Sequence, residues 1–186
     1  MKVNHEPSTP VYWMLLEQEE WRLHLAATEA GLAYVGSQDK SFEEMEEAVS
    51  RRLPRAEWIR DEDKLRPYAA AISAYLRGET RGFDLPHDFR GTPFQLAVWR
   101  ALCEVPYGQT LSYSDIAHRI GKPAAVRAVG AAIGANPALI TVPCHRVIGK
   151  GGALTGYRGG LAMKTRLLAL ERGRADAGRE RNPVHA

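Results

Sequence analysis

The first half of the chain alternates short apolar runs with polar turns, whereas apolar positions in the second half recur every three or four residues. Short apolar runs bounded by turn residues predict strands at 11–16, 21–27 and 32–36. Ser41, with acidic residues after it, is a candidate N-cap for a helix that runs to about Leu53. An i, i+3, i+4 pattern that includes Tyr68 and Tyr75 predicts a second helix, which ends at Gly78. The first half is therefore predicted to be strands followed by helices.

The second half is predicted to be mainly helical. Thr92 is placed to cap a helix with Pro93 at its first position, Ser112 to cap the next, and Pro123 to open a third. A glycine-dense loop at 149–160 precedes the last helix. The helices are expected at 93–105, 113–120, 124–135 and 161–171. The two middle helices, joined by a short glycine-containing turn, have the proportions of a helix-turn-helix.

Length and composition allow one or two domains. The chain has 186 residues, 45% of them hydrophobic and 25% charged, as in ordinary globular proteins. The segment from Gly78 to Gly91 is rich in glycine, proline and charge, which indicates a linker. We therefore expect an N-terminal domain over 1–88 and a second domain over 89–186, with a basic tail from about residue 174.

The net charge of +3 hides an asymmetry between the two halves. Residues 1–88 hold 11 Lys and Arg against 17 Asp and Glu, whereas residues 89–186 hold 14 against 5. Four of the latter bases lie near the C-terminus: Arg172, Arg174, Arg179 and Arg181. Without them the second half still has ten bases against five acids. This distribution favours a polyanionic partner such as nucleic acid for the second half.

The N-terminal apolar run and the cysteines indicate the cellular location of the protein. The apolar run at 11–16 is far too short to span a membrane and lacks the flanks of a signal peptide. The two cysteines have no metal-ligand spacing and fit a reducing compartment. We expect a cytoplasmic protein with no membrane contact.

The candidate nucleophile is Cys144, which stands between Pro143 and the basic pair His145 and Arg146. Neighbouring imidazole and guanidinium groups are expected to lower the pKa of a thiol and make it a nucleophile. Cys103 lies four residues after a tryptophan on a predicted helix, so we interpret it as a packed, unreactive thiol.

The helix predicted at 124–135 is almost entirely alanine, glycine and valine, with Arg127 as its one polar side chain. Readers of base sequence need several Arg, Asn, Gln or Ser side chains, so this helix would read sequence poorly. Its smooth face would instead permit close approach to a shallow groove, with Arg127 able to fill the gap left by an extruded base. Small residues can equally serve tight helix packing, and the composition alone leaves both interpretations open.

Six motifs, in this order and spacing, carry a resemblance to a known family: Ser112-Tyr113, Arg127-Ala-Val-Gly130, Asn136-Pro137, Pro143-Cys-His-Arg146, Gly156-Tyr-Arg-Gly-Gly160 and Leu167-Leu-Ala-Leu-Glu171. Over about residues 91–173 the chain resembles the O6-alkylguanine-DNA alkyltransferases, which repair DNA and are consumed in the act. The resemblance implies an α+β protein, with a ribonuclease H-like α/β N-terminal domain. A mainly helical, winged-helix-like domain with a helix-turn-helix would follow it and carry the reactive cysteine.

The resemblance also implies roles for single residues. Cys144 would accept the alkyl group irreversibly, in the single-turnover reaction of a methylated-DNA–[protein]-cysteine S-methyltransferase. His145 would take the thiol proton through a water, and Glu171 would orient the imidazole. Tyr113 would donate a proton to the leaving guanine, and Asn136 would brace the turn before the cysteine.

The partner implied by the resemblance is duplex DNA that contains O6-alkylguanine, bound through the minor groove with little sequence preference. The base would flip into a pocket, and the protein would act as a monomer, singly or cooperatively along the duplex, associated with the nucleoid when bound. The residues expected to contact DNA are Tyr113, Ala125, Arg127, Ala128, Gly130 and Ala131. Those expected to form the pocket are Val147, Tyr157, Arg158, Gly159 and Gly160.

Two departures from the family pattern affect these expectations. Some relatives carry a structural zinc in the N-terminal domain, but that half of this chain has no cysteine, so we expect no metal and no cofactor. Several relatives have a small residue where this chain has Arg158, which could narrow the pocket or grip a phosphate.

Three other functions compete with alkyl transfer. An alkyltransferase-like protein that only binds lesions would lack the acceptor Cys144. A cysteine hydrolase would need a dyad of Cys144 and His145, which adjacent positions on an extended segment make strained. A helix-turn-helix transcription factor would need a more polar recognition helix than 124–135.

Overall fold

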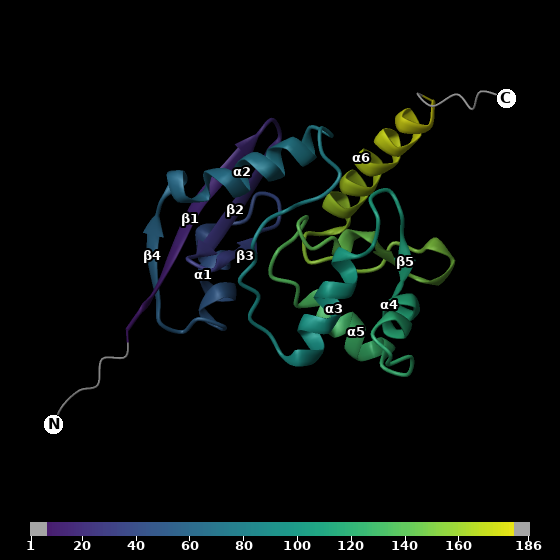
Figure 1. Cartoon of the computed structure of the whole chain (residues 1–186), viewed down its shortest axis with the longest axis horizontal. Helices are drawn as coiled ribbons and strands as arrows, with labels where there is room; N and C mark the ends of the chain where they lie inside the picture. The colour runs from purple at the N-terminus through teal and green to yellow at the C-terminus, as the bar shows by residue number, and fades with distance from the viewer. Residues whose placement is uncertain (1–6, 181–186) are drawn as a thin grey trace.

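The computed structural model describes residues 7–180, and side chains as far as Arg174. Its first half is a four-stranded sheet in the order β3-β2-β1-β4 (Figure 1). The strands are β1 (Thr9–Gln18), β2 (Trp21–Thr28), β3 (Gly31–Val35) and β4 (Ala56–Arg60). β1 and β2 form an antiparallel hairpin, β3 pairs antiparallel with β2, and β4 pairs parallel with β1. The three strands predicted from the short apolar runs are confirmed.

The two faces of the sheet are covered by different partners. Alternate residues Leu23 and Leu25 of β2 join the main core, which includes α2 (Glu62–Leu76) and most of the second half of the chain. Ala26, which points the other way, joins a smaller core under α1 (Phe42–Ser50). Because both faces are buried, β3 carries no exposed residue.

The sequence pattern missed β4 and the first turns of α2. β4 reads Ala-Glu-Trp-Ile-Arg, with no fully buried residue, as suits a short strand at the edge of the sheet. α2 begins at Glu62, where the Asp61 side chain accepts a hydrogen bond from the amide of Lys64. Its first turns are polar and contain Pro67, so the apolar spacing becomes visible only from Tyr68 onward.

The second half is mainly helical, as predicted. It contains α3 (Pro93–Cys103), α4 (Tyr113–Arg119), α5 (Val126–Gly134), a 3-10 turn η1 (Cys144–Arg146), a second such turn η2 (Lys150–Gly152) and α6 (Leu161–Glu180), with β5 (Leu111–Ser112) paired parallel to β6 (Val147–Ile148). Thr92 and Ser112 cap α3 and α4 with reciprocal side-chain hydrogen bonds, as the sequence indicated.

Two predicted boundaries were wrong. The helix expected from residue 124 begins at Val126, because Lys122 to Ala125 form a turn closed by a hydrogen bond from the Ala125 amide to the Lys122 carbonyl. The last helix does not stop at Glu171 but continues to Glu180, so the start of the predicted basic tail is helical. Arg181 lies outside the described residues.

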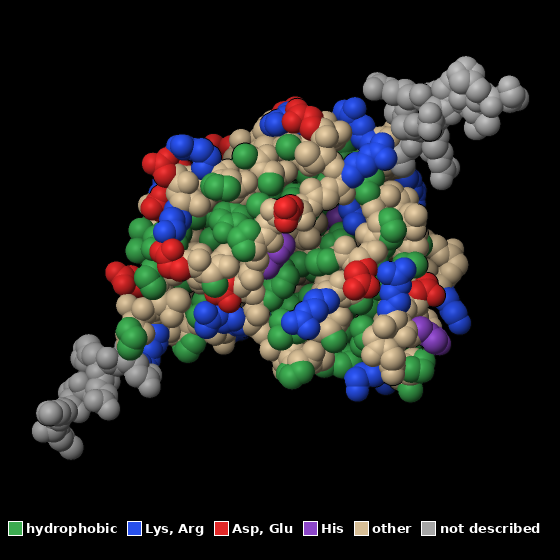
Figure 2. Space-filling model, in the orientation of Figure 1, with side chains coloured by type: hydrophobic (Ala, Val, Ile, Leu, Met, Phe, Trp, Pro, Cys, Tyr) green, Lys and Arg blue, Asp and Glu red, His purple; other side chains and the backbone are tan. Residues whose placement is uncertain are grey.

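The C-terminal end of α2 meets the middle of α6, where Figure 2 shows Lys and Arg side chains gathered. Arg174 donates to the carbonyl oxygen of Arg77, and Arg81 donates to the carbonyl oxygen of Arg174. Arg174 therefore caps the C-terminal end of α2, while Arg81 binds the backbone of α6.

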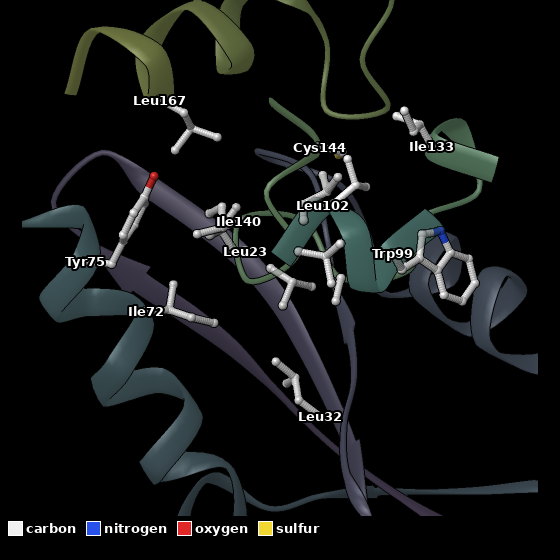
Figure 3. Packing of buried hydrophobic residues seen from close by; sticks show 14 of the residues in the cluster. Leu23, Leu32, Ile72, Tyr75, Trp99, Leu102, Ile133, Ile140, Cys144 and Leu167 are labelled. Carbon is white, nitrogen blue, oxygen red and sulfur yellow. The ribbon is translucent and has the colours of Figure 1, made fainter. Parts of the chain in front are cut away.

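One core joins the two halves of the molecule. Leu23 and Leu32 of the sheet, Tyr75 of α2, and Trp99 and Leu102 of α3 belong to a single buried cluster (Figure 3). The division at residue 88 stays a prediction. None of the described helices is long and apolar enough to cross a membrane.

Candidate active site

The backbone between α5 and η1 turns sharply and brings Cys144 inside the molecule. The Thr141 amide donates to the Leu139 carbonyl across Ile140, a buried residue held at φ 70°. A β-branched residue with positive φ is strained, at a cost of about 1–3 kcal/mol. The Cys144 amide makes the same short bond, to the Val142 carbonyl. Two tight turns in succession therefore replace the extended segment assumed for Cys144 and His145.

Asn136 holds this segment and the cysteine together. Its Nδ2 donates to the Val142 carbonyl at 3.0 Å and to Cys144 Sγ at 3.1 Å, while its Oδ1 accepts from the Ala138 amide at 3.0 Å. The side chain is fully buried. Bracing by Asn136 was predicted, but its direct hydrogen bond to the sulfur was not.

His145, Arg146 and Glu171 form a buried charged network beside the cysteine. His145 Nε2 lies 2.8 Å from Glu171 Oε1, and Arg146 donates to both carboxylate oxygens through Nε at 3.0 and 3.1 Å. Burial alone would raise the pKa of Glu171, but hydrogen bonds from His145 and Arg146 outweigh it and lower the pKa to about 2. The carboxylate is therefore ionised at neutral pH.

The expectation that His145 and Arg146 lower the thiol pKa was wrong. Burial raises the pKa of Cys144, and the opposing contributions come from the Asn136 hydrogen bond and from the charges of Arg158 and Lys164. Arg146 is instead paired with Glu171 and the carbonyl oxygen of Val105. The resting group is a neutral thiol, which needs a base.

His145 has the protonation state that a base requires. Burial lowers the pKa of His145 and outweighs the effect of the hydrogen bond that Nε2 donates to Glu171, so the imidazole is neutral at pH 7. Its Nδ1 is buried and has no hydrogen-bond partner among the described residues. With Nε2 turned to Glu171, Nδ1 is the nitrogen free to receive a proton.

Sequence reasoning missed two buried polar residues around Cys144 and Glu171. Lys164, almost fully buried, donates Nζ to the carbonyl oxygens of Val147 and Thr155. Its spacing of seven residues from Glu171 on α6, with Leu167 and Leu168 between, was a usable signal. Tyr75 donates its hydroxyl to Glu171, but its place in an apolar pattern gave no sign of that role.

Cys144 lies at the floor of a cavity of about 470 Å³. The lining residues are Tyr113, Gly130, Ile133, Gly134, Cys144, Gly156, Tyr157 and Arg158. The Tyr113 hydroxyl lies 2.8 Å from Thr155 Oγ1, and the Tyr157 hydroxyl is buried without a partner among the described residues. A small organic ligand would fit this volume, and the Cys144 sulfur belongs to the residues that line it.

Three other residues expected in the pocket are not among those that line the cavity. Val147 is fully buried and pairs with Leu111 in the β5–β6 ladder. A side chain on Gly159 would meet the ring of Tyr157 and Met163, so this glycine lets them pack. Gly160 has φ 86° and starts α6, since its carbonyl accepts from the Lys164 amide.

Arg158 lines the cavity but faces the sheet rather than a phosphate. Its guanidinium donates to the carbonyl oxygens of Asn136, Val35 and Pro137 and to the Tyr34 hydroxyl, and it stacks 5.2 Å from the centre of the Tyr34 ring. Of the two possibilities raised by the sequence, a grip on a phosphate is the less favoured, because these hydrogen bonds join Arg158 to both halves of the chain.

Of the residues expected to contact DNA, Tyr113 begins α4, Ala125 precedes α5, and the other four lie on α5. Arg127, Ala128 and Ala131 are exposed, while Ala125 and Gly130 are half-buried. Val129, Ala132 and Ile133 face the core. The small residues thus serve packing on one side and leave a smooth surface on the other.

Cys103 is exposed rather than packed, in contrast to the expectation from its helix position. Partial removal of the thiol from solvent nevertheless raises the pKa of Cys103, so Cys103 is not an activated thiol. Its exposure makes it a necessary control in any labelling of Cys144.

Comparisons with known proteins match both halves of the chain. Residues 11–89 match the family model "6-O-methylguanine DNA methyltransferase, ribonuclease-like domain", and residues 93–173 match the DNA binding domain of the same family. The inducible methylated-DNA–protein-cysteine methyltransferase of Bacillus subtilis is 61% identical over 87% of this chain and 90% of its own length. That of Methanosarcina barkeri is 43% identical over 87% of this chain and 97% of its own.

A solved structure agrees with the sequence matches. The Mycobacterium tuberculosis O6-methylguanine methyltransferase superposes with a TM-score of 0.76 at 40% identity, covering 88% of this chain and 94% of that one. The expected fold class, a ribonuclease-like domain followed by a helical DNA-binding domain, is confirmed. A cavity lined by a cysteine, a buried His–Glu pair and matches over both domains lead to one conclusion: this chain belongs to the 6-O-methylguanine DNA methyltransferase family.

Proposed function

We propose that this protein repairs DNA by transferring an alkyl group from O6-alkylguanine in duplex DNA to Cys144, once per molecule. The observation that carries the proposal is the cavity of about 470 Å³ that Cys144 lines. Asn136 donates a hydrogen bond to the Cys144 sulfur, and the next residue, His145, has a neutral imidazole. Relatives over most of the chain bear the name methylated-DNA–protein-cysteine methyltransferase.

The chemistry needs a soft nucleophile and a base that is neutral beforehand. The Cys144 thiol proton passes through a water to Nδ1 of His145, whose imidazolium is then stabilised by Glu171. The thiolate attacks the alkyl carbon, an S–C bond forms, and the C–O6 bond breaks with its electron pair going to guanine. The thioether is stable, so the protein does not turn over.

Guanine leaves more easily when it is protonated as the bond breaks. Tyr113 stands at the cavity wall with its hydroxyl next to Thr155 Oγ1, so we assign it the proton donation. The phenol regains its proton from solvent once the base has left. The buried Tyr157 hydroxyl, unpartnered among the described residues, is available to hold the base.

DNA would approach α5, the second helix of the helix-turn-helix. α1 to α4 each have a side-chain cap, whereas the start of α5 has none among the described residues. Uncapped amides at a helix N-terminus favour a phosphate. The smooth face at Ala128 and Ala131 would fit the minor groove, and Arg127 would replace the flipped base in the stack.

Stoichiometry separates this proposal from its rivals. A duplex that carries one O6-methylguanine is incubated with the protein over a range of molar ratios, and repaired lesions are counted. We expect one lesion repaired per protein molecule. Cys144→Ala should still bind the duplex and repair none, and Cys103→Ala should repair as many as the unaltered protein. Repeated turnover would contradict the proposal and favour a hydrolase, and binding without any repair would favour a lesion-binding protein.

A further inference from the structure

Tyr75 is a residue of the first half of the chain that contacts the buried network of His145, Arg146 and Glu171. It lies near the end of α2, is fully buried, and reaches toward α6 with its hydroxyl on the α6 side (Figure 3). The hydroxyl donates to Glu171 Oε1 at 2.5 Å and lies 3.3 Å from His145 Nε2. Its ring packs against Phe83 and Tyr107, which fixes its orientation.

The Glu171 carboxylate is shared among donors from several segments. Oε1 accepts from His145, Arg146 and Tyr75, and Oε2 accepts from Arg146 and from the amide of Gly108 at 3.0 Å. Tyr75 is the member of this set that comes from the first half of the chain. Each added donor on Oε1 draws negative charge away from the contact with His145 Nε2.

We propose that Tyr75 is a positioning residue for the reaction at Cys144, which keeps His145 neutral with its proton on Nε2. This inference rests on the proposed function. Glu171 accepts the Nε2 proton, and the hydroxyl of Tyr75 competes for the same oxygen, so formation of the imidazolium before the reaction is opposed. The lone pair then stays on Nδ1, the nitrogen without a partner among the described residues.

Other charged groups around His145 act in known directions. Glu171 on α6 raises its pKa, whereas Lys164 on α6 and Arg146 on η1 lower it. Tyr75 is itself neutral, because burial and the Glu171 charge raise its pKa far above its usual value. The Tyr107 ring lies near Arg146, and its hydroxyl has no partner among the described residues. Tyr75 is therefore a neutral donor whose effect can be removed without changing any charge.

The test replaces one hydroxyl group. Tyr75→Phe keeps the ring, and Tyr107→Phe removes a neighbouring hydroxyl that bonds to nothing described, as the matched control. We expect ¹⁵N-histidine NMR of Tyr75→Phe to show the His145 titration midpoint raised by about half to one pH unit. The single-turnover rate should be about three- to tenfold lower on the acidic side and nearly unchanged above that midpoint. Tyr107→Phe should leave the midpoint in place.

Several results would overturn the inference. A Tyr75→Phe rate lowered equally at every pH, with an unmoved His145 midpoint, would reduce Tyr75 to a structural role. In the unaltered protein, an imidazolium or an Nδ1-protonated imidazole at pH 7 would also refute it, whether or not the variant folds. The NMR titration needs no DNA, so failure of alkyl transfer in the unaltered protein would refute the proposed function separately.

Discussion

The carboxylate of Glu171 joins three elements, α6, α2 and η1. His145 and Arg146 reach it from η1 and Tyr75 from α2, while the residue itself sits on α6. Each donor compensates part of the cost of burying this charge, so losing one of them lowers stability. The orienting role implied by the family pattern is therefore accompanied by a structural one, which the sequence did not indicate.

Replacing Glu171 with Gln should lower the free energy of unfolding and make it depend less on pH in the acidic range. Glu171 has a pKa of about 2 in the fold against about 4.3 unfolded. The unfolded chain thus binds more protons between these values, and the stabilisation, present above about pH 4.3, is lost as pH falls toward 2. That loss is about 3 kcal/mol.

Urea unfolding at a series of pH values measures how the free energy of unfolding depends on pH. Glu171→Gln should be about 3–5 kcal/mol less stable at pH 7, because Arg146 loses its partner, and should show a flatter slope below pH 4.3. Glu104→Gln, on an exposed side chain, is the control and should behave like the unaltered protein. An unchanged acid slope in Glu171→Gln would mean that another group causes the acid sensitivity.

At the scale of elements, α5 combines a packed face with an open one. Ala128 and Ala131 are exposed on a nine-residue helix whose other face buries Val129, Ala132 and Ile133. Alanine is a good helix former, but it gains little by burial, so nothing in the fold requires a smooth outer surface here. The DNA partner proposed above would account for this smooth surface.

Ala128→Glu should weaken binding to duplex DNA about tenfold or more while leaving thermal stability nearly unchanged, since a carboxylate would then face the phosphates. Ala70→Glu places the same side chain on an exposed position of α2 and serves as the control. Fluorescence anisotropy at fixed salt measures both. Equal affinities in the two variants would place the DNA surface elsewhere.

Elements with local signals were predictable from the sequence, and those set by distant contacts were not. Thr92 and Ser112 cap their helices through bonds to residues three positions away, so the pattern alone indicated them. β4 exists because it pairs with β1, some 47 residues earlier in register, and its own sequence is too polar to show it. The 3-10 turn at Cys144 likewise depends on bonds from Asn136.

At the scale of the molecule, the sheet supports the segment that carries Cys144. The end of β3 exchanges backbone bonds with residues 137 and 139, and Arg52 donates to the carbonyl oxygen of Ala135. Arg158 then ties Tyr34 and Val35 to the turn at Asn136. The first half of the chain thus fixes the backbone from which the cysteine is presented. The motifs predicted which residues gather at the site, but not this support.

Arg158→Ala should cost about 2–3 kcal/mol of stability, because hydrogen bonds from a charged group to four oxygen atoms are lost. Amides of residues 136–144 should exchange hydrogen faster, as their support is removed. The thiol pKa of Cys144 should rise, since the Arg158 charge opposes the effect of burial. Arg100→Ala, an exposed arginine on α3, is the control for stability and exchange. Unchanged exchange in residues 136–144 would show that Arg158 does not hold the turn.

The most direct measurement locates the transferred group. A duplex whose O6-methylguanine carries a trideuterated methyl group is mixed with the protein in equal amounts, and the digested protein is read by mass spectrometry. We expect one labelled methyl on the peptide that contains Cys144 and none on the peptide with the exposed Cys103. A label on Cys103, or loss of the lesion with Cys144 unmodified, would contradict the account.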